Sequence, residues 1–148
     1  MLSVKEIMTK EVVTVSPETG IADAAKLLLE RGFNGVPVVD EMNKVVGLVC
    51  QSDLVAQQKK FPVPSVFTIL DGIISFTSMK HLEKEIQKMT ATTVADAMTP
   101  NPVTVEPETS IEEAGSIMVD RHFHTLPVVD EGELVGIVGK EDVLRTLV

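Results

Sequence analysis

The stretch VKEIMTKEVVTVSPETGIADAAKLLLERGFNGVPVVD, residues 4–40, occurs a second time as VADAMTPNPVTVEPETSIEEAGSIMVDRHFHTLPVVD, residues 94–130. The two copies align over their whole length at one constant offset, position 4 with position 94. A one-residue deletion follows in the second copy, after which Asp53 aligns with Asp142. Chance does not produce a duplication of this length, so the chain consists of two copies of one structural unit.

Each copy has the pattern strand, helix, strand, strand, helix. The β-branched runs VVTV and PVTV predict a first strand, which ends at Pro17 and at Pro107. A helix follows in each copy, with Thr19 and Thr109 as candidate N-caps. Two apolar runs around a turn then predict a hairpin, and a short helix closes the copy. The residues expected on the apolar helix faces are Ile21, Ala24, Ala25, Leu28 and Leu29 in the first copy and Ile111, Ala114, Ile117 and Met118 in the second.

The duplication predicts a first domain at 1–58, an inserted and partly helical segment at 59–91, and a second domain at 92–148. In the insert, a helix is predicted from Ser78 with apolar residues along one face. Two interpretations of this apolar material remain open: it packs over the two repeats, or it forms part of an interface with a second subunit or another partner.

The composition argues against several classes of function. A net charge of −9 and an aromatic content of 3% leave the chain without the cationic surface and the stacking rings of a nucleic-acid-binding protein. No apolar run reaches membrane-spanning length, and the N-terminus lacks the layout of a signal peptide. The single Cys50 fits a reducing compartment. We therefore expect a cytoplasmic protein that binds neither nucleic acid nor membrane.

The sequence contains no arrangement of residues typical of a catalytic site. Neither a glycine-rich phosphate-binding motif nor a nucleophile elbow is present. His122 and His124 have no cysteines or clustered carboxylates at the spacing of metal ligands. We expect no enzymatic activity and no metal site.

The residues common to both copies resemble a known family. Each copy carries Met-Thr near its start, then Val-Thr-Val, Pro-Glu-Thr and Pro-Val-Val-Asp, and finally Val-Gly followed by an acid. This pattern is similar to a tandem pair of CBS (cystathionine-β-synthase) domains, a Bateman module, over nearly the whole chain outside 58–91. The resemblance implies an α/β (α+β) fold in which two β-α-β-β-α repeats pack about a pseudo-two-fold axis. Two clefts form in such a pair, and in this family they commonly bind AMP, ADP, ATP or S-adenosylmethionine.

The resemblance implies that Asp53 and Asp142 bind the ribose of such a ligand. An acid at a strand-to-helix turn can accept hydrogen bonds from both ribose hydroxyls, and the free N–H groups of the turn suit a phosphate. Alternatively, the two acids only stabilise the helices that they begin. The family usually has Thr or Ser at the phosphate-facing position, where this chain has Cys50 and Gly139. The other candidate ligand contacts are Ser52, Thr14, Val15, Asn34, Gly35, Val36, Lys140, Thr104, Val105, His124, Thr125 and Leu126.

Together these features predict a stand-alone regulatory CBS protein of the prokaryotic type. We expect it to sense an adenosine-containing ligand, without an obligatory cofactor, and to act in trans on an effector protein of unknown identity. The alternative is a structural dimerisation module with empty clefts, which Cys50 and Gly139 favour because neither offers a strong donor to phosphate. A homodimer is expected because helix residues such as Leu28-Leu29 and Ile117-Met118 leave apolar surface for a second copy.

Overall fold

The computed structural model describes residues 2–60 and 92–148, so the helix predicted from Ser78 and both interpretations of the insert lie outside the described residues. None of the helices in these two ranges is long and apolar enough to cross a membrane. The elements are α1 (Val4–Ile7), α2 (Ile21–Arg31), β1 (Gly35–Val39), β2 (Val45–Cys50), α3 (Gln51–Lys60), α6 (Val94–Ala97), β3 (Thr99–Pro100), α7 (Ile111–Arg121), β4 (Thr125–Asp130), β5 (Glu133–Gly139) and α8 (Lys140–Arg145).

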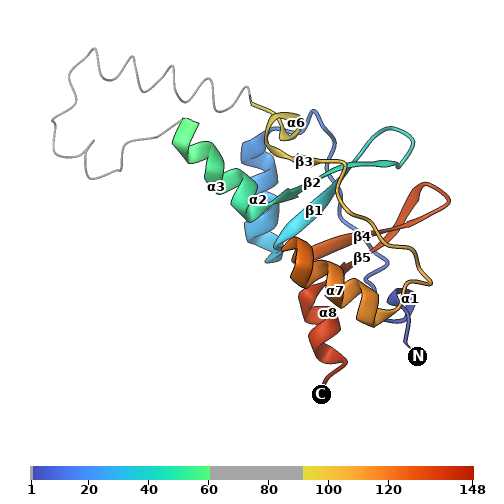
Figure 1. Ribbon diagram of the computed structural model, residues 1–148. Helices are drawn as coiled ribbons and strands as arrows, with labels where there is room; N and C mark the ends of the chain where they lie inside the picture. The colour runs from blue at the N-terminus through green and yellow to red at the C-terminus, as the bar shows by residue number, and fades with distance from the viewer. Residues whose placement is uncertain (1, 61–91) are drawn as a thin grey trace, which may run out of the picture.

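Each repeat is built around the predicted hairpin. The strands β1 and β2 pair antiparallel, as do β4 and β5, and each hairpin has a bulge at the same place, after Val38 and after Val128. The two hairpins lie side by side with their tips at the same edge of the molecule (Figure 1). At the tips, the backbone and the side-chain amide of Asn43 both hydrogen-bond the backbone of Leu134. The mixed helix and strand content and the small antiparallel sheets form an α+β fold.

The runs VVTV and PVTV form much less strand than the sequence predicts. Only Val15 and Val105 pair, each as an isolated parallel bridge, with Val38 and Val128. The next amide in the first copy, that of Ser16, donates to the Thr19 hydroxyl at 3.1 Å, and the second copy repeats this bond. Alternate residues of a strand face the same neighbour, so the next N–H needed would come from Pro17 or Pro107, and proline has none; pairing therefore stops after one residue.

The prediction of Thr19 and Thr109 as helix N-caps is wrong by one residue. The N-caps are Gly20 and Ser110, and the Ser110 hydroxyl accepts a hydrogen bond from the amide of Glu113 at 3.1 Å. The two threonines instead bind amides on their N-terminal side and close the preceding turn. Each threonine hydroxyl is used in the turn that precedes the helix, so it does not serve as the N-cap.

Each long helix buries a narrower face than the sequence predicts. On α2, Ile21, Ala24 and Leu28 are buried, whereas Leu29 is 79% exposed. The helix α7 buries the equivalent residues, Ile111, Ala114 and Met118. Leu28 and Met118 are in the core. They therefore do not contribute to the exposed apolar surface that was expected at Leu28-Leu29 and at Ile117-Met118.

The repeats exchange their N-terminal arms, residues 2–9 and 92–99. Val4 is fully buried in the core of the second repeat, among residues such as Ala114 and Leu126. Val94 is fully buried in the core of the first repeat, with Ala24 and Leu28. Each core is therefore completed by the arm of the other copy.

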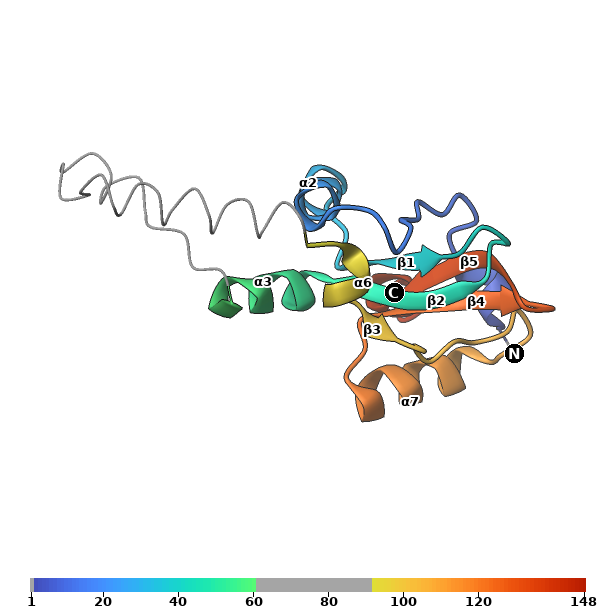
Figure 2. The same ribbon diagram turned by 90° about the horizontal axis from the view of Figure 1, so that it is seen from above.

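Reciprocal backbone bridges hold the exchanged arms. Ser3 bridges Ser110 in the second repeat, and the equivalent residue Thr93 bridges Gly20 in the first. Further along each arm, Thr9 pairs with Ile137, and β3 pairs with β2. Such reciprocity is what a two-fold relation between the repeats requires. Figure 2 shows the corresponding arrangement of the helices, with α2 on one side of the strands and α7 on the other.

The glycine of each Val-Gly pair makes room for the exchanged arm. A β-carbon at Gly136 would stand 2.5 Å from the sulfur of Met8, and one at Gly47 would collide with the sulfur of Met98. Each methionine belongs to the arm of the other repeat and packs against the glycine. The Met-Thr and Val-Gly motifs therefore form one contact across the repeats.

The helices α2 and α7 both end on a residue in the left-handed conformation, Gly32 with φ 67° and His122 with φ 58°. A side chain costs free energy in this conformation. We expect His122→Gly to raise the free energy of unfolding by about 0.5–1 kcal/mol, as measured by urea denaturation. Gly32→His is the matched reverse change and should lower it. A destabilised His122→Gly variant would show that the imidazole makes a favourable contact that outweighs the backbone strain.

Candidate ligand-binding site

A cavity of about 260 Å³ is lined by residues of both repeats. From the second repeat it receives the end of β5 and the start of α8, and from the first repeat the segment between α2 and β1. The structure brings together eight of the residues predicted from the sequence: Asn34, Gly35, Val36, His124, Thr125, Gly139, Lys140 and Asp142. The two copies thus share one cavity, and Asn34–Val36 face the site of Asp142.

The cavity wall also contains residues that the sequence did not indicate. They are Thr9, Glu11, Val12, Val13, Gly32, Phe33, Ile137, Glu141 and Arg145. The first four belong to the first copy and its N-terminal arm, which reaches the second repeat through the exchange. The repeated Met-Thr pair was the available signal, since Thr9 and Thr99 both lie beside the strand that leads to an aspartate.

Several predicted contacts do not line this cavity. The side chains of Val15, Val105 and Leu126 are buried in the two cores, where they pack against other apolar side chains. Their neighbours Thr14 and Thr104 are not among the residues that line it either. The sequence predicts four of these contacts on the first strand and the fifth, Leu126, before the second strand of its copy; all five stay predictions.

The residues Cys50, Ser52 and Asp53 also lie away from this cavity, at the junction of β2 and α3. This junction is equivalent to Gly139–Asp142 in the second repeat, where β5 leads into α8. The structure therefore separates the two aspartates, as two clefts related by the two-fold arrangement require.

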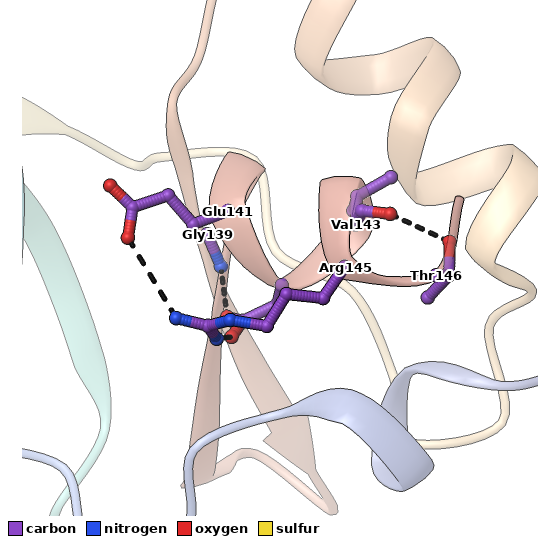
Figure 3. Close-up of polar contacts among 6 residues, drawn as sticks. Gly139, Glu141, Val143, Arg145 and Thr146 are labelled. Carbon is purple, nitrogen blue, oxygen red and sulfur yellow. Dashed lines mark hydrogen bonds and ion pairs between the residues drawn. The ribbon is translucent and has the colours of Figure 1, made fainter. Parts of the chain in front are cut away.

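The carboxylate of Asp142 has a defined orientation. Its Oδ2 accepts a hydrogen bond from the backbone N–H of Gly139 at 2.8 Å, and its Oδ1 accepts one from Nη1 of Arg145 at 3.0 Å. The Asp142 side chain is only 15% exposed. Figure 3 shows the contacts around α8, with the guanidinium of Arg145 directed toward the carboxylate of Glu141. The hydrogen bond from Gly139 fixes Oδ2, whereas Oδ1 is bound by the exposed side chain of Arg145.

Asp53 repeats this geometry in the first copy. Its Oδ2 accepts a hydrogen bond from the backbone N–H of Cys50 at 2.8 Å. Partial burial raises the pKa of Asp53, while the Cys50 amide and a hydrogen bond from the Thr99 side chain act in the opposite direction. Thr99 belongs to the exchanged arm, so both repeats contribute to the surroundings of this acid as well.

The two phosphate-facing positions differ in their surroundings. Burial, and secondarily the charge of Asp53, raise the pKa of the Cys50 thiol to about 11. At neutral pH the thiol is therefore protonated and is a weak hydrogen-bond donor rather than a nucleophile. Gly139 has φ −106°, and a β-carbon there would meet its nearest neighbours at 3.7 Å. Position 139 thus accepts a larger residue without strain.

Comparison with known proteins identifies the family. The family model for the CBS domain matches residues 4–60 and again residues 94–148. The CBS domain-containing protein CBSX1 of Arabidopsis thaliana, a chloroplastic protein, is 36% identical over 97% of this chain. The chain spans 63% of the length of CBSX1 and 56% of the related CBSX2.

Two solved structures have the same fold and contain adenosine compounds. The crystal structure of CBSX2 from Arabidopsis thaliana in complex with AMP is 31% identical, with a TM-score of 0.75, and covers 99% of this chain and 96% of that one. The CBS domain pair of MJ0100, in complex with 5′-methylthioadenosine and S-adenosyl-L-methionine, is 25% identical with a TM-score of 0.74. The alignment covers 99% of this chain and all of that pair. The chain therefore belongs to the CBS domain family and carries two CBS domains in tandem.

Proposed function

We propose that this chain is a regulatory module that binds an adenosine-containing ligand in the cavity at Asp142. The observation that carries the proposal is the pre-oriented, largely buried carboxylate of Asp142 in a cavity built by both repeats. A relative with the same fold, CBSX2, has been crystallised with AMP. A ligand that touches both repeats stabilises their association, which is how binding at this place would be transmitted to a partner.

The wall of the cavity suits the three parts of a nucleotide. The carboxylate of Asp142 would accept the hydroxyls of the ribose. Val12, Val13 and Ile137 provide an apolar surface for the adenine ring. Lys140 and Arg145 provide the cations for a phosphate. An equivalent cleft at Asp53 and Thr99 is part of the proposal, because the two-fold arrangement repeats the same contacts there.

Thermal unfolding with and without ligand tests this function. AMP, ADP, ATP, S-adenosylmethionine and adenosine should raise the melting temperature when they bind the native state, by an amount that grows with ligand concentration. At one hundred times the dissociation constant the stabilisation is about 2.7 kcal/mol. Ribose 5-phosphate, which lacks the adenine, is the control. Equal melting temperatures in all solutions at millimolar concentration would contradict the proposal.

Other features of the proposed function remain predictions. We propose that the chain acts in trans on an effector protein and catalyses no reaction of its own. Within residues 2–60 and 92–148 no three His, Cys, Asp or Glu side chains gather as potential metal ligands. The absence of nucleic-acid binding and the cytoplasmic location are still expectations from the sequence, and the relatives CBSX1 and CBSX2 are chloroplastic.

A structural module that only dimerises is the second candidate function. The observation that favours it is that Asp53 and Asp142 already hold the backbone amides of Cys50 and Gly139, as helix-capping acids do. In that case none of the adenosine compounds changes the melting temperature, while the dimer described next still forms.

A homodimer is proposed for either function. Leu29 and Val119 occupy equivalent positions on α2 and α7 and are 79% and 73% exposed. Val55 and Leu144, also equivalent, are exposed on α3 and α8. A two-fold dimer brings the same patch of two copies together and would cover these exposed side chains, so we propose a second copy as their partner. Sedimentation should give about twice the 16.0 kDa of one chain. Leu29→Glu should shift the protein to the monomer, and a monomeric parent would contradict the proposal.

A further inference from the structure

We infer that Arg145 competes with the ligand for Asp142, so that the Asp142 cavity selects adenosine compounds that carry a phosphate over those that do not. This inference rests on the proposed function and specifies the ligand class of the same site. It follows from the contacts of Arg145, from the exposure of its side chain, and from the absence of an arginine at the equivalent position of the first repeat.

Both oxygens of Asp142 are occupied in the absence of a ligand. Gly139 holds Oδ2 through the backbone, and Arg145 holds Oδ1 at 3.0 Å. Each oxygen has two lone pairs, so two ribose hydroxyls would have to share Oδ1 and Oδ2 with these two donors. The Gly139 bond is part of the turn that begins α8 and cannot yield without disturbing the helix. The ligand therefore competes with Arg145 for Oδ1.

Arg145 can be displaced at low cost. Its side chain is 70% exposed, and its second contact is Oε2 of Glu141 at 4.0 Å, also on an exposed side chain (Figure 3). Water can replace the partners of so exposed a guanidinium, so its ion pairs are weak. The arginine thus weakens ribose binding without blocking it.

Whether the displaced Arg145 finds a new partner depends on the charge of the ligand. The charged side chains on the cavity wall are Glu11, Glu141, Asp142, Lys140 and Arg145. Adenosine takes Asp142 from Arg145 and offers no anion in return. A phosphate on the 5′ carbon would offer Arg145 and Lys140 a partner with the geometry that guanidinium binds through two parallel hydrogen bonds. A phosphorylated ligand therefore regains the binding free energy that adenosine loses when it takes Asp142 from Arg145.

The first repeat provides a natural comparison. At the position of Arg145 it has Ala56, and at the position of Lys140 it has Gln51. No arginine on α3 can therefore reach Asp53 in the way that Arg145 reaches Asp142. We expect the competition, and the preference for phosphate that follows from it, to be a property of the Asp142 cavity alone.

The test is calorimetric titration of the parent and of Arg145→Gln with adenosine, AMP and ADP. The variant should bind adenosine about two- to fivefold more tightly, because the competitor is gone. It should bind AMP and ADP about fivefold or more weakly, because the phosphate has lost its partner. Arg121→Gln removes the same charge from an exposed position outside the cavity and should change neither affinity.

The outcomes separate this inference from the proposed function. If the parent binds adenosine and AMP but Arg145→Gln changes both in the same direction or neither, the inference is wrong and the function stands. If the parent binds none of the three compounds, the proposed function is wrong and the inference falls with it. Opposite changes for adenosine and AMP, absent in Arg121→Gln, support the inference, because a merely structural role for Arg145 would affect both ligands alike.

Discussion

Val4→Asp should unfold the protein or reduce its free energy of unfolding by at least about 4 kcal/mol. Val4 is fully buried and packs in the core of the second repeat, although it stands at the start of the first. A carboxylate there would lie among apolar side chains, and an unpaired buried charge costs several kcal/mol. Since the whole stability of a small domain is about 5–15 kcal/mol, one such change can exceed it.

Lys5→Ala is the matched control, because it changes the next residue of the same arm. Lys5 is exposed and forms an ion pair with Glu108 at 2.8 Å, so its loss should change the free energy of unfolding little. Val94→Asp tests the other arm and should be as damaging as Val4→Asp, since Val94 is fully buried in the first repeat. Urea denaturation gives all three values. A Val4→Asp variant as stable as Lys5→Ala would mean that the arm is not docked on the second repeat.

The exchange of arms explains which parts of the fold were predictable from the sequence. The repeat structure, its hairpins and its helices follow from patterns within about forty residues, and these predictions are confirmed for residues 2–60 and 92–148. The partner of Val4 is a matter of tertiary packing, and no local pattern states whether an arm packs on its own repeat or on the other. The exposure of Leu29 was missed for the same reason, since helical spacing predicts an apolar face but not how much of it a neighbour covers.

The candidate site, too, was only partly predictable from the sequence. The aspartates and the turns that hold them could be predicted, because they depend on residues close in sequence and on the resemblance to CBS domains. Val12 and Val13 were missed, since they follow the exchanged arm and line the cavity only because that arm packs on the second repeat. Arg145 was missed because it has no equivalent in the first copy, and a comparison of repeats draws attention to what both copies share.

Asp142→Ala should weaken the binding of adenosine compounds by roughly 2–4 kcal/mol, which is about 30-fold to 1,000-fold in the dissociation constant. The variant removes the acceptor of both proposed ribose bonds. It also removes the hydrogen bond to the amide of Gly139, so the free energy of unfolding should fall by about 1 kcal/mol. Calorimetric titration with AMP measures the first effect and urea denaturation the second.

Asp96→Ala separates the two effects, because Asp96 begins α6 in the same way but lies outside the cavity. Its Oδ2 accepts from the backbone N–H of Thr93 at 3.1 Å, as that of Asp142 does from Gly139. We expect Asp96→Ala to lose a similar amount of stability and to bind AMP as the parent does. Asp142→Asn should be intermediate, since its amide oxygen can still accept from Gly139 while the charge for the ribose is gone. If Asp142→Ala and Asp96→Ala bind AMP equally well, Asp142 is a helix-capping acid only, and the ribose must be placed elsewhere.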